Sequence, residues 1–464
     1  MGSYRIDFEH PNHIYFMGIG GISMSGLAEI LLKEGFRISG SDAKESSFTD
    51  RLSALGATVV YGQRSENITD DIDCVVYTAA IHPDNPEYRT AMEKQIPMLT
   101  RAKLLGQMMR RYRRSIAVSG THGKTTTTSM LSHILVKAGT DPTISVGGVL
   151  PLIGGNIRVG GNDTFLLEAC EYTNSFLSFS PTMEIILNVE ADHLDFFKDI
   201  DDIRSSFHRF VERLPEDGTV IIDSRIRAYR ELVRDFPGRV VTVGTKGADI
   251  YAEELLYDEY GHPSFVPVAF GEALSRVQLA VPGEHNIFNA LAAIAAGLEL
   301  GLPAARIREG LQDFRGTVRR FEKKGELNGA TIIDDYAHHP QEIEATLRAA
   351  EHYPHRELWC VFQPHTYSRT RALLPEFGRA LELSDHVLLA DIYAARETDT
   401  LGVSAADVER AINADTPGKA LYLSSFEEIE RYLMEKLSPG DLCITMGAGD
   451  IYRVGEELLQ KSKK

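Results

Sequence analysis

The stretch of residues 115–139 constrains the fold of this chain more than any other part of the sequence. It begins with a short apolar run at 116–118, of the kind that forms a buried parallel strand. The sequence GTHGKT follows at 120–125, and apolar residues then recur at helical spacing until Gly139. A strand, a glycine turn and a helix in this order predict a cradle for a phosphate group, because backbone N–H groups and the helix N-terminus attract anions.

Two side chains in this cradle suit the same purpose. Lys124 adds a positive charge, and Thr125 has a hydroxyl group that could hold Mg²⁺. The usual pattern is G-x-x-x-x-G-K-[ST], and valine stands at position 118, where its first glycine belongs. An ordinary glycine turn before a helix is the alternative interpretation. The preceding strand and the lysine and threonine directly behind the second glycine favour phosphate binding.

Length and charge narrow the class of protein. The 464 residues predict roughly three domains of ~150 residues each. The formal net charge of −17 argues against a nucleic-acid or anionic-membrane partner, since both need a positively charged face. Without a secretory leader or an apolar run near ~18 residues, we expect a cytoplasmic protein with no membrane insertion, as a monomer or a weak homodimer. Four cysteines without metal-ligand spacing are expected to be buried and reduced: Cys74, Cys170, Cys360 and Cys443.

The first predicted domain, residues 1–113, begins with a βαβ unit of dinucleotide-binding type. A strand at 14–17 leads into the glycine sequence GIGG at 18–21, and the next strand leads to Asp42. Glycines let the backbone approach a ligand, and this carboxylate could accept a hydrogen bond from a ribose hydroxyl. Position 23 is serine where G-x-G-x-x-G requires glycine, so NAD binding is the weaker interpretation. Further strands are predicted at 36–39, 58–61 and 74–77, and a solvated linker at 110–114.

The second predicted domain, residues 114–315, contains the phosphate loop. Strands are predicted at 164–167 and 183–187. They end at Glu168 and shortly before His193, on the side of the sheet where ligands of open α/β sheets bind. A carboxylate, an imidazole and a threonine around phosphates could hold Mg²⁺. A helix-capping glutamate and a satisfied loop histidine are the alternatives.

A later segment of this domain carries two asparagines on one helix face. Asn286 and Asn289 are three residues apart in an alanine-rich stretch. An amide both donates and accepts hydrogen bonds, which suits reading the edge of an adenine base. N-capping of the helix by Asn286 is the competing explanation, and the segment alone does not decide between them.

The third predicted domain, residues 316–464, begins with Arg319 and Arg320, which could reach nucleotide phosphates from a hinge. The polar sequence DDYAHHP at 334–340 follows a strand and has too many polar groups for a plain core. A second polar cluster, QPHTYSRTR, occupies 363–371. Strands alternate with helices, so a doubly wound, mainly parallel sheet is expected. The strands are predicted at 331–333, 358–362, 386–390 and 442–445.

These segments together resemble the Mur ligases. Seven motifs carry the resemblance in order along the chain: GIGG, GTHGKT, NVEADH, HN, RRF, DDYAHHP and QPH, which begin at Gly18, Gly120, Asn188, His285, Arg319, Asp334 and Gln363. The resemblance implies three α/β domains. A Rossmann-like domain would hold a UDP-linked substrate, a P-loop ATPase-like domain would hold ATP, and a Rossmann-like carboxyl-terminal domain would close over both with the amino acid.

Within the family, the chain is most similar to members that join L-alanine to the lactyl carboxylate of UDP-N-acetylmuramate. The resemblance implies that ATP phosphorylates this carboxylate and that the amine of L-alanine attacks the acyl phosphate. ATP and Mg²⁺ are therefore the expected cofactors, and the two small molecules the expected partners. Lys124 and Arg320 would neutralise the γ-phosphate, and His339 would lie near the amino acid.

The same resemblance assigns ligands to individual residues. ATP contacts are implied for Gly120, Thr121, His122, Gly123, Lys124, Thr125, Thr126, His285, Asn286, Asn289, Arg320 and Asp335. UDP-substrate contacts are implied for Gly18, Gly20, Gly21, Ser41, Asp42, Thr78, Arg101, Arg369 and Arg371. Thr125 and Glu168 would hold one Mg²⁺ and His193 a second. The catalytic set is Lys124, Arg320, His193 and His339.

The sequence departs from the family pattern in one place and agrees with the alanine-adding members in another. The family often has EADESD where this chain has EACEYT at 168–173, so the usual aspartates are missing. No lysine lies between Asp199 and Asp217, so the carbamylated lysine of later-acting Mur ligases is not expected there. The rival interpretations are a sister ligase such as the murein tripeptide-recycling ligase, a folylpolyglutamate synthase, an NAD-dependent sugar-nucleotide dehydrogenase, and a nucleotide switch protein.

Overall fold

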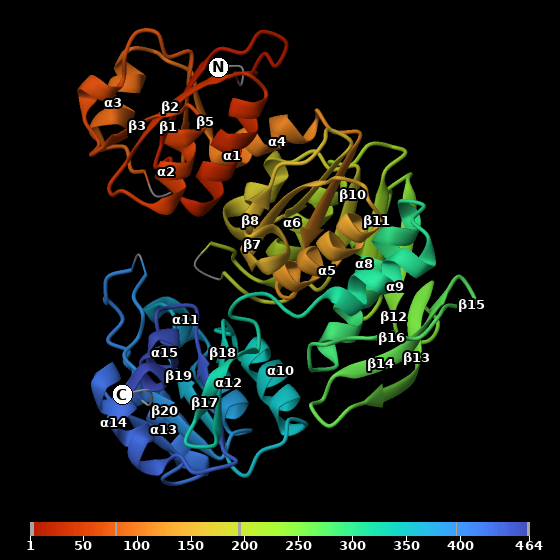
Figure 1. Ribbon diagram of the computed structural model, residues 1–464, viewed down its shortest axis with the longest axis vertical. Helices are drawn as coiled ribbons and strands as arrows, with labels where there is room; N and C mark the ends of the chain where they lie inside the picture. Colours follow the sequence, from red (N-terminus) through yellow and green to blue (C-terminus); the bar gives the residue numbers. More distant parts are fainter. Residues whose placement is uncertain (1–3, 79–80, 194–195, 396, 462–464) are drawn as a thin grey trace.

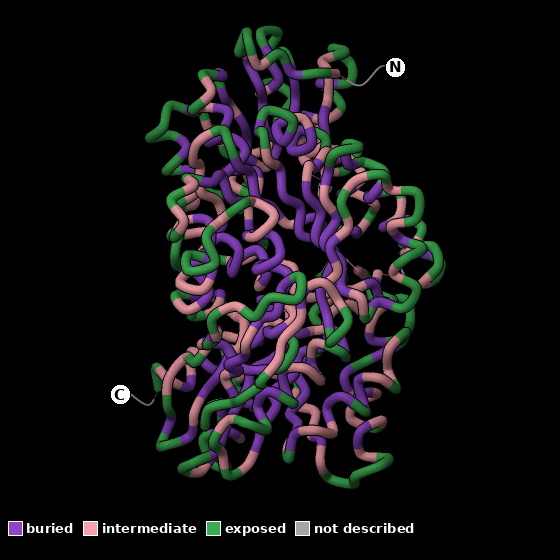
Figure 2. Tube along the Cα trace, turned by 90° about the vertical axis from the view of Figure 1, so that its right-hand side faces the viewer, coloured by how far each residue is buried: buried purple, intermediate pink, exposed green. Residues whose placement is uncertain are grey.

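The computed structural model describes residues 4–78, 81–193, 196–395 and 397–461. Its three β-sheets follow one another along the longest axis of the molecule (Figure 1). Buried chain segments run through the interior of each part, and exposed ones lie at the periphery (Figure 2). Among the residues described, no helix has the length and apolar character needed to span a bilayer.

The amino-terminal sheet has five parallel strands in the order β3-β2-β1-β4-β5. The strands are β1 (His13–Met17), β2 (Arg37–Asp42), β3 (Thr58–Tyr61), β4 (Cys74–Tyr77) and β5 (Met98–Thr100). The helices are α1 (Ile22–Lys33), α2 (Ser47–Ala54), η1 (Ser65–Asn67), α3 (Pro86–Glu93) and α4 (Arg101–Met109). The strand order reverses between β1 and β4, which places a ligand crevice beside the glycine loop that follows β1.

The central sheet is the largest, and its strand order is β15-β14-β13-β12-β11-β10-β6-β9-β7-β8, with β16 paired to β14. Its parallel part comprises β6 (Arg114–Ser119), β7 (Thr143–Leu150), β9 (Thr164–Glu168), β10 (Met183–Ile186), β11 (Thr219–Asp223) and β12 (Arg239–Gly244). The edges carry β8 (Gly155–Arg158), β13 (Ile250–Tyr257), β14 (Pro263–Ala269), β15 (Glu272–Ala273) and β16 (Val277–Gln278). The antiparallel pairs at both edges, β7–β8 and β13–β14, were not part of the sequence prediction.

Helices cover both faces of this sheet. The helices of the central domain are α5 (Lys124–Lys137), η2 (Pro151–Ile153), η3 (Tyr172–Ser178), α6 (Ile200–Val211), α7 (Tyr229–Leu232), α8 (His285–Glu299) and α9 (Ala304–Asp313). One face packs against α5, α8 and α9 in a core of small and branched residues. The opposite face packs against α6 and η3.

The carboxyl-terminal sheet has the order β17-β18-β22-β19-β20-β21, and only its edge strand β17 is antiparallel. Its strands are β17 (Glu322–Leu327), β18 (Ala330–Asp335), β19 (Leu358–Phe362), β20 (His386–Leu389), β21 (Ala420–Tyr422) and β22 (Leu442–Met446). Its helices are α10 (Pro340–Glu351), α11 (Tyr367–Ala372), α12 (Leu374–Leu381), α13 (Ala405–Asp415), α14 (Phe426–Lys436) and α15 (Tyr452–Lys461). Three mainly parallel α/β sheets confirm the predicted fold class, whereas the predicted domain limits at 113/114 and 315/316 stay predictions.

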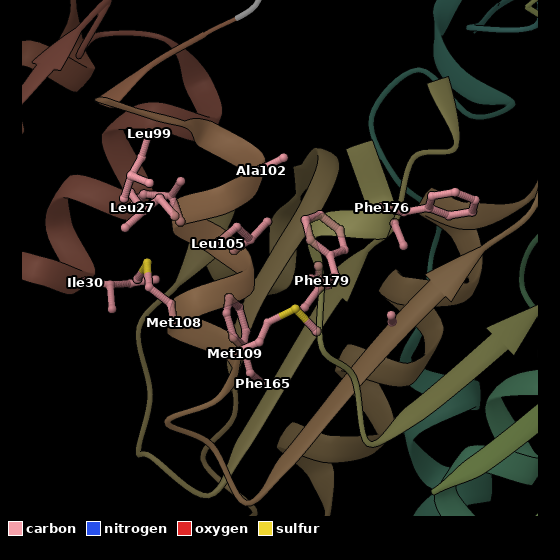
Figure 3. Close-up of a cluster of buried hydrophobic side chains, with 14 of the residues drawn as sticks. Leu27, Ile30, Leu99, Ala102, Leu105, Met108, Met109, Phe165, Phe176 and Phe179 are labelled. Atoms are coloured by element: carbon pink, nitrogen blue, oxygen red, sulfur yellow. The ribbon is translucent and has the colours of Figure 1, made fainter. Parts of the chain in front are cut away.

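The amino-terminal and central parts share one hydrophobic core (Figure 3). Leu105 and Met108 on α4 lie between α1, represented by Leu27, and the central domain, represented by Phe165 and Phe179 (Figure 3). The carboxyl-terminal sheet has separate clusters on its two faces. The first two domains therefore form a continuously packed unit, and the third meets them through a more polar contact.

Glycine at position 106 on α4 is required by this packing. A Cβ atom there would lie 1.9 Å from the backbone oxygen of Ser178, far inside van der Waals contact. We predict that Gly106→Ala lowers the free energy of unfolding by about 3 kcal/mol, since overpacking against backbone cannot relax by a rotamer change. Urea unfolding measures the effect. Gly155→Ala is the control, because a Cβ there meets nothing within 4 Å, and equal stability of the two variants would contradict the shared core.

The prediction of four buried cysteines can be compared with the structure here. Cys74, Cys360 and Cys443 are buried, but Cys170 is exposed, so the prediction of four buried cysteines is wrong for one. The reason is that Cys170 lies beyond the end of β9, on the loop at the edge of the ligand crevice. Residues 79 and 80, which follow Thr78 after β4, lie outside the described residues.

Candidate active site

The predicted phosphate cradle is formed by the turn between β6 and α5. Gly123 is the N-cap of α5 with φ +80°, and a Cβ there would lie 2.6 Å from the side-chain oxygen of Asn289. Gly120 has φ +135°. Both values lie in the region that side chains with a Cβ rarely adopt, so the two glycines of GTHGKT are required by the backbone.

Lys124 is held in the cradle by an acidic partner that the sequence did not identify. Its Nζ lies 3.2 Å from Oε2 of the buried Glu171, donates to the carbonyl of Thr121 at 2.9 Å, and also contacts the carbonyl of Gly120. Burial would lower the pKa of Lys124, but the Glu171 carboxylate raises it above its ordinary value. The ammonium therefore stays charged at the mouth of the phosphate loop.

Thr125 and Glu168 come together beside the loop, as predicted. The Thr125 hydroxyl donates to Glu168 Oε2 at 3.2 Å, and the N–H of Gly147 donates to Oε1 at 2.6 Å. Burial raises the pKa of the Glu168 carboxyl, so a positively charged neighbour would stabilise its ionised form. A hydroxyl and a carboxylate at the end of a phosphate loop are oxygen ligands of the kind Mg²⁺ takes, so these two residues fit the ion.

His193 is positioned differently. It has φ +53°, its ring stacks on Tyr172 at 4.4 Å, and its Nε2 lies 3.8 Å from Asp192. It lines the same cavity as Thr125. In the part of the chain that the structure describes, no three His, Cys, Asp or Glu side chains are gathered as a metal site. The second metal at His193 therefore stays a prediction.

A cavity of about 400 Å³ between the central and carboxyl-terminal domains gathers most of the predicted nucleotide residues. It is lined by Thr121, His122, Gly123, Lys124, Thr125, Thr126, His193, His285, Asn286, Asn289, Arg320 and Asp335, among others. Residues from the phosphate loop, from α8 and from the hinge before β17 thus face one space. Its size suits a nucleotide.

The two asparagines on α8 share a face, but their amides bind the protein. Asn286 donates to the carbonyl of Pro282 at 2.7 Å and accepts from Asn289 at 3.0 Å. Asn289 also accepts from the Thr127 hydroxyl at 3.3 Å. Asn286 lies inside the helix, whose N-cap is Glu284, so the N-capping alternative is wrong. These contacts fix α8 against the phosphate loop.

The two hinge arginines differ sharply. Arg319 binds the buried Asp334 at 2.9 Å and the carbonyls of Gly447 and Gly449 at 2.7 and 3.0 Å, so the predicted reach of Arg319 to phosphates is not supported. The Arg320 guanidinium lines the cavity, and among the described residues it has no ion pair or hydrogen bond, only the Tyr336 ring at 5.1 Å.

Asp335 also lines this cavity, but its carboxylate is engaged. It accepts from the N–H groups of Phe321 and Ala337 at 2.7 and 2.8 Å. Burial raises its pKa to about 6. The carboxylate therefore fixes the hinge backbone at the position from which Arg320 enters the cavity.

Charged side chains join the central domain to the carboxyl-terminal domain. Nε2 of His122 lies 3.2 Å from Glu190, and Nδ1 lies 3.2 Å from Glu342 on α10. Burial alone would lower the pKa of His122, but the two carboxylates raise it to about 10. The ring of His339, the N-cap of α10, lies 4.9 Å from the His122 ring. The phosphate loop and α10 are therefore linked through a charged imidazolium.

Arg369 and Arg371 do not act as a pair in the structure. Arg369 lies 3.1 Å from Asp192 and 3.2 Å from Nδ1 of His365, and it lines a second cavity of about 530 Å³ between the domains. Arg371 is exposed and donates to the carbonyl of Leu401 at 3.3 Å. The predicted substrate contact is compatible with Arg369, whereas the placement of Arg371 does not support it.

The glycine loop after β1 is fixed by the neighbouring strand. The N–H groups of Gly18 and Ile19 donate to the carbonyl of Ser41 at 2.9 Å, and Asp42 accepts from the N–H of Gly20 at 2.8 Å. Gly21 is the N-cap of α1. The Asp42 carboxylate thus shapes the loop, in addition to any ligand contact it makes.

Two other predicted residues of the amino-terminal domain have protein contacts. The Ser41 hydroxyl is buried and donates to the buried Glu87 at 2.7 Å, so the predicted ligand contact by this side chain is not supported. Arg101 begins α4 and donates to the Ser23 hydroxyl at 2.8 Å, which places it at the glycine loop. Thr78 directly follows β4, at the carboxyl edge of the same sheet.

Comparison with models of known protein families shows the family to which this chain belongs. The models described as Mur ligase family catalytic domain, Mur ligase middle domain and Mur ligase glutamate ligase domain match residues 13–113, 118–297 and 319–449. These matches cover most of the chain and follow the order of the three sheets. The chain belongs to the Mur ligase family.

Particular relatives refine this assignment. The UDP-N-acetylmuramate–L-alanine ligase of Lachnospira eligens is 58% identical over 459 residues, which cover 98% of this chain and 100% of that protein. The ligase of the same name from Agathobacter rectalis is 56% identical over 464 residues, with 99% and 100% coverage. Among solved structures, the UDP-N-acetylmuramate-alanine ligase of Thermotoga maritima has a TM-score of 0.80 at 29% identity, with 97% and 99% coverage. A murein peptide ligase of Psychrobacter arcticus has a TM-score of 0.70 at 25% identity, with 97% and 98% coverage.

Proposed function

We propose that this chain ligates L-alanine to the lactyl carboxylate of UDP-N-acetylmuramate, with ATP converted to ADP and phosphate. The observation that carries the proposal is a phosphate loop with a charged Lys124 that faces a cavity between two domains, in a chain 58% identical to a ligase of that name. The reaction would be the first amino-acid addition in cytoplasmic peptidoglycan synthesis.

The first step would join the carboxylate to the γ-phosphorus. A carboxylate oxygen attacks phosphorus, the bond to the bridging oxygen breaks, and ADP leaves with that electron pair. Such transfer needs positioning and charge neutralisation more than covalent help. Lys124 and Arg320 would supply the positive charge from opposite domains, and Mg²⁺ at Thr125 and Glu168 would add to it when bound.

The second step would form the amide bond. The uncharged amine of L-alanine attacks the acyl carbon, its nitrogen loses a proton to water, and the tetrahedral adduct then expels phosphate as the C–O bond breaks. Nε2 of His339 is buried without a protein partner among the described residues, while Nδ1 accepts from the N–H of Gln341 at 3.4 Å. This arrangement indicates an Nε2–H donor, which suits a developing oxyanion or the leaving phosphate.

The test is phosphate release with one amino acceptor at a time. UDP-N-acetylmuramate and ATP would be incubated with L-alanine, glycine, L-serine or the tripeptide L-alanyl-γ-D-glutamyl-meso-diaminopimelate. We expect L-alanine to give the highest kcat/KM and the tripeptide to match the blank. Greater release with the tripeptide would assign the chain to the recycling ligases instead. Release that ignores the sugar nucleotide would contradict ligation altogether.

Asp42 provides a separate test of where the sugar nucleotide binds. Because its carboxylate shapes the glycine loop through Gly20, we expect Asp42→Ala to weaken UDP-N-acetylmuramate binding about tenfold while ADP binding changes less than twofold. Calorimetric titration of both ligands measures this. Asp50→Ala is the control, since Asp50 is exposed on α2. A larger loss for ADP would show that the amino-terminal domain is not the UDP site.

A further inference from the structure

The carboxyl edge of the central sheet extends well beyond the phosphate loop. The phosphate loop follows β6, and Glu168 ends β9 on one side of it. On the other side come β10, β11 and β12 in order. Neighbouring strands lie about 4.8 Å apart, so the end of β11 lies about 10 Å from the phosphate loop. A nucleotide with its phosphates on the loop has room to extend its base along this edge.

The same cavity that contains Lys124 continues to the ends of these strands. Asp223 and Val243, at the ends of β11 and β12, line it together with Arg225 and with Phe288 of α8. Helix α8 packs on β11 and β12 (Figure 1). The amides of Asn286 and Asn289 each use one donor and one acceptor for contacts within the protein, with Pro282 and Thr127 among the partners, and the predicted reading of adenine by these amides stays a prediction.

Arg225 forms a rigid planar surface at this end of the cavity. Its guanidinium carbon lies 3.2 Å from the centre of the Phe288 ring. The buried Asp223 carboxylate accepts from Nε at 3.0 Å and from the terminal NH2 nitrogen at 2.6 Å. A guanidinium held by a carboxylate fork with an aromatic ring behind it cannot rotate freely. One of its faces covers the ring, and the side chain keeps 44% of its surface exposed.

We propose that the outer face of the Arg225 guanidinium is the platform on which the purine base of the nucleotide stacks, with Asp223 and Phe288 as its positioning residues. The inference rests on the proposed use of ATP and adds the residue that binds the base. A planar cation stacks on a π system through dispersion and electrostatic attraction. Val281 and Pro282 line the same cavity and give the base an apolar surface to meet.

The test separates base binding from phosphate binding in the full-length protein. Dissociation constants would be measured for ADP and for inorganic tripolyphosphate, which has no base. We expect Arg225→Ala to weaken ADP binding about 5- to 30-fold and to change tripolyphosphate binding less than twofold. Arg225→Lys should lose nearly as much, because an ammonium keeps the charge but has no planar face. Lys124→Ala should weaken both ligands.

Two control variants separate the loss of stacking from other effects of the Arg225 substitution. Arg227→Ala removes an exposed arginine from the same loop and should bind ADP like the parent protein. Because Arg225→Ala leaves the buried Asp223 unpaired, the double variant Asp223→Asn/Arg225→Ala repeats the measurement without the stranded charge. Unchanged ADP binding, full retention in Arg225→Lys, or equal losses for ADP and tripolyphosphate would overturn the platform. A parent protein that does not bind ADP would contradict the proposed function instead.

Discussion

Replacing Lys124 with alanine is expected to lower kcat about 100- to 1000-fold while UDP-N-acetylmuramate binds within twofold of the parent affinity. Lys124 places a partly buried ammonium at the phosphate loop, where negative charge develops during phosphoryl transfer. The sugar-nucleotide loop is shaped by another sheet, through Ser41 and Asp42. Steady-state kinetics and calorimetric titration of the sugar nucleotide measure the two effects separately.

Lys137→Ala is the matched control for this variant. Lys137 ends the same helix, α5, and forms an exposed ion pair of 2.7 Å with Asp313. Its loss should leave kcat unchanged, because an exposed pair contributes little. Equal losses of turnover and of sugar-nucleotide affinity in Lys124→Ala would contradict the separation of the two sites.

Arg320 and its neighbour Arg319 should respond to the same substitution in opposite ways. Arg320→Ala is expected to lower kcat about 1000-fold with little change in Tm, because its guanidinium faces the cavity and makes no ion pair among the described residues. Arg319→Ala should destabilise the carboxyl-terminal domain by about 3–5 kcal/mol, because it leaves the buried Asp334 without its cation. Kinetics and thermal unfolding of both variants test the pair.

The two arginine variants are compared in their kcat and in their Tm. A loss of Tm in Arg320→Ala equal to that in Arg319→Ala would mean that both residues are structural. A fully active Arg320→Ala would remove the charge that the carboxyl-terminal domain is proposed to bring to ATP. Arg320→Lys, which keeps the charge without the planar fork, should recover part of kcat.

Much of the fold could be predicted because buried parallel strands are short apolar runs with polar residues at their carboxyl ends. The strands β1, β6, β9, β18 and β19 were all found in this way. The strand β11 was not predicted, and the loop with Arg225 was missed because it directly follows this strand. The hairpin β13–β14 was missed as well, because residues 254–257 are exposed and this edge lacks the apolar pattern of the parallel strands.

Residue types and spacing predicted which side chains gather in the site, but not which atoms remain free. Thr125 and Glu168 meet because β6, which leads through the phosphate loop to Thr125, is the neighbour of β9, a consequence of topology that the sequence implied. The hydroxyl of Ser41 and the amide oxygen of Asn289 are used by protein partners that lie far away in the sequence. Glu171, the partner of Lys124, matches the fourth position of the family pattern EADESD, and only its distance to Nζ revealed its role.

Transfer of oxygen from the sugar-nucleotide carboxylate to phosphate is the most direct test of the proposed acyl-phosphate reaction. UDP-N-acetylmuramate labelled with ¹⁸O in the lactyl carboxylate would be converted with ATP and L-alanine, and the released phosphate analysed by mass spectrometry. Activation of the carboxylate at Lys124 and Arg320 predicts one ¹⁸O atom in each phosphate formed, because the acyl-phosphate C–O bond breaks. Phosphate without the label, formed alongside the amide product, would contradict the acyl-phosphate route.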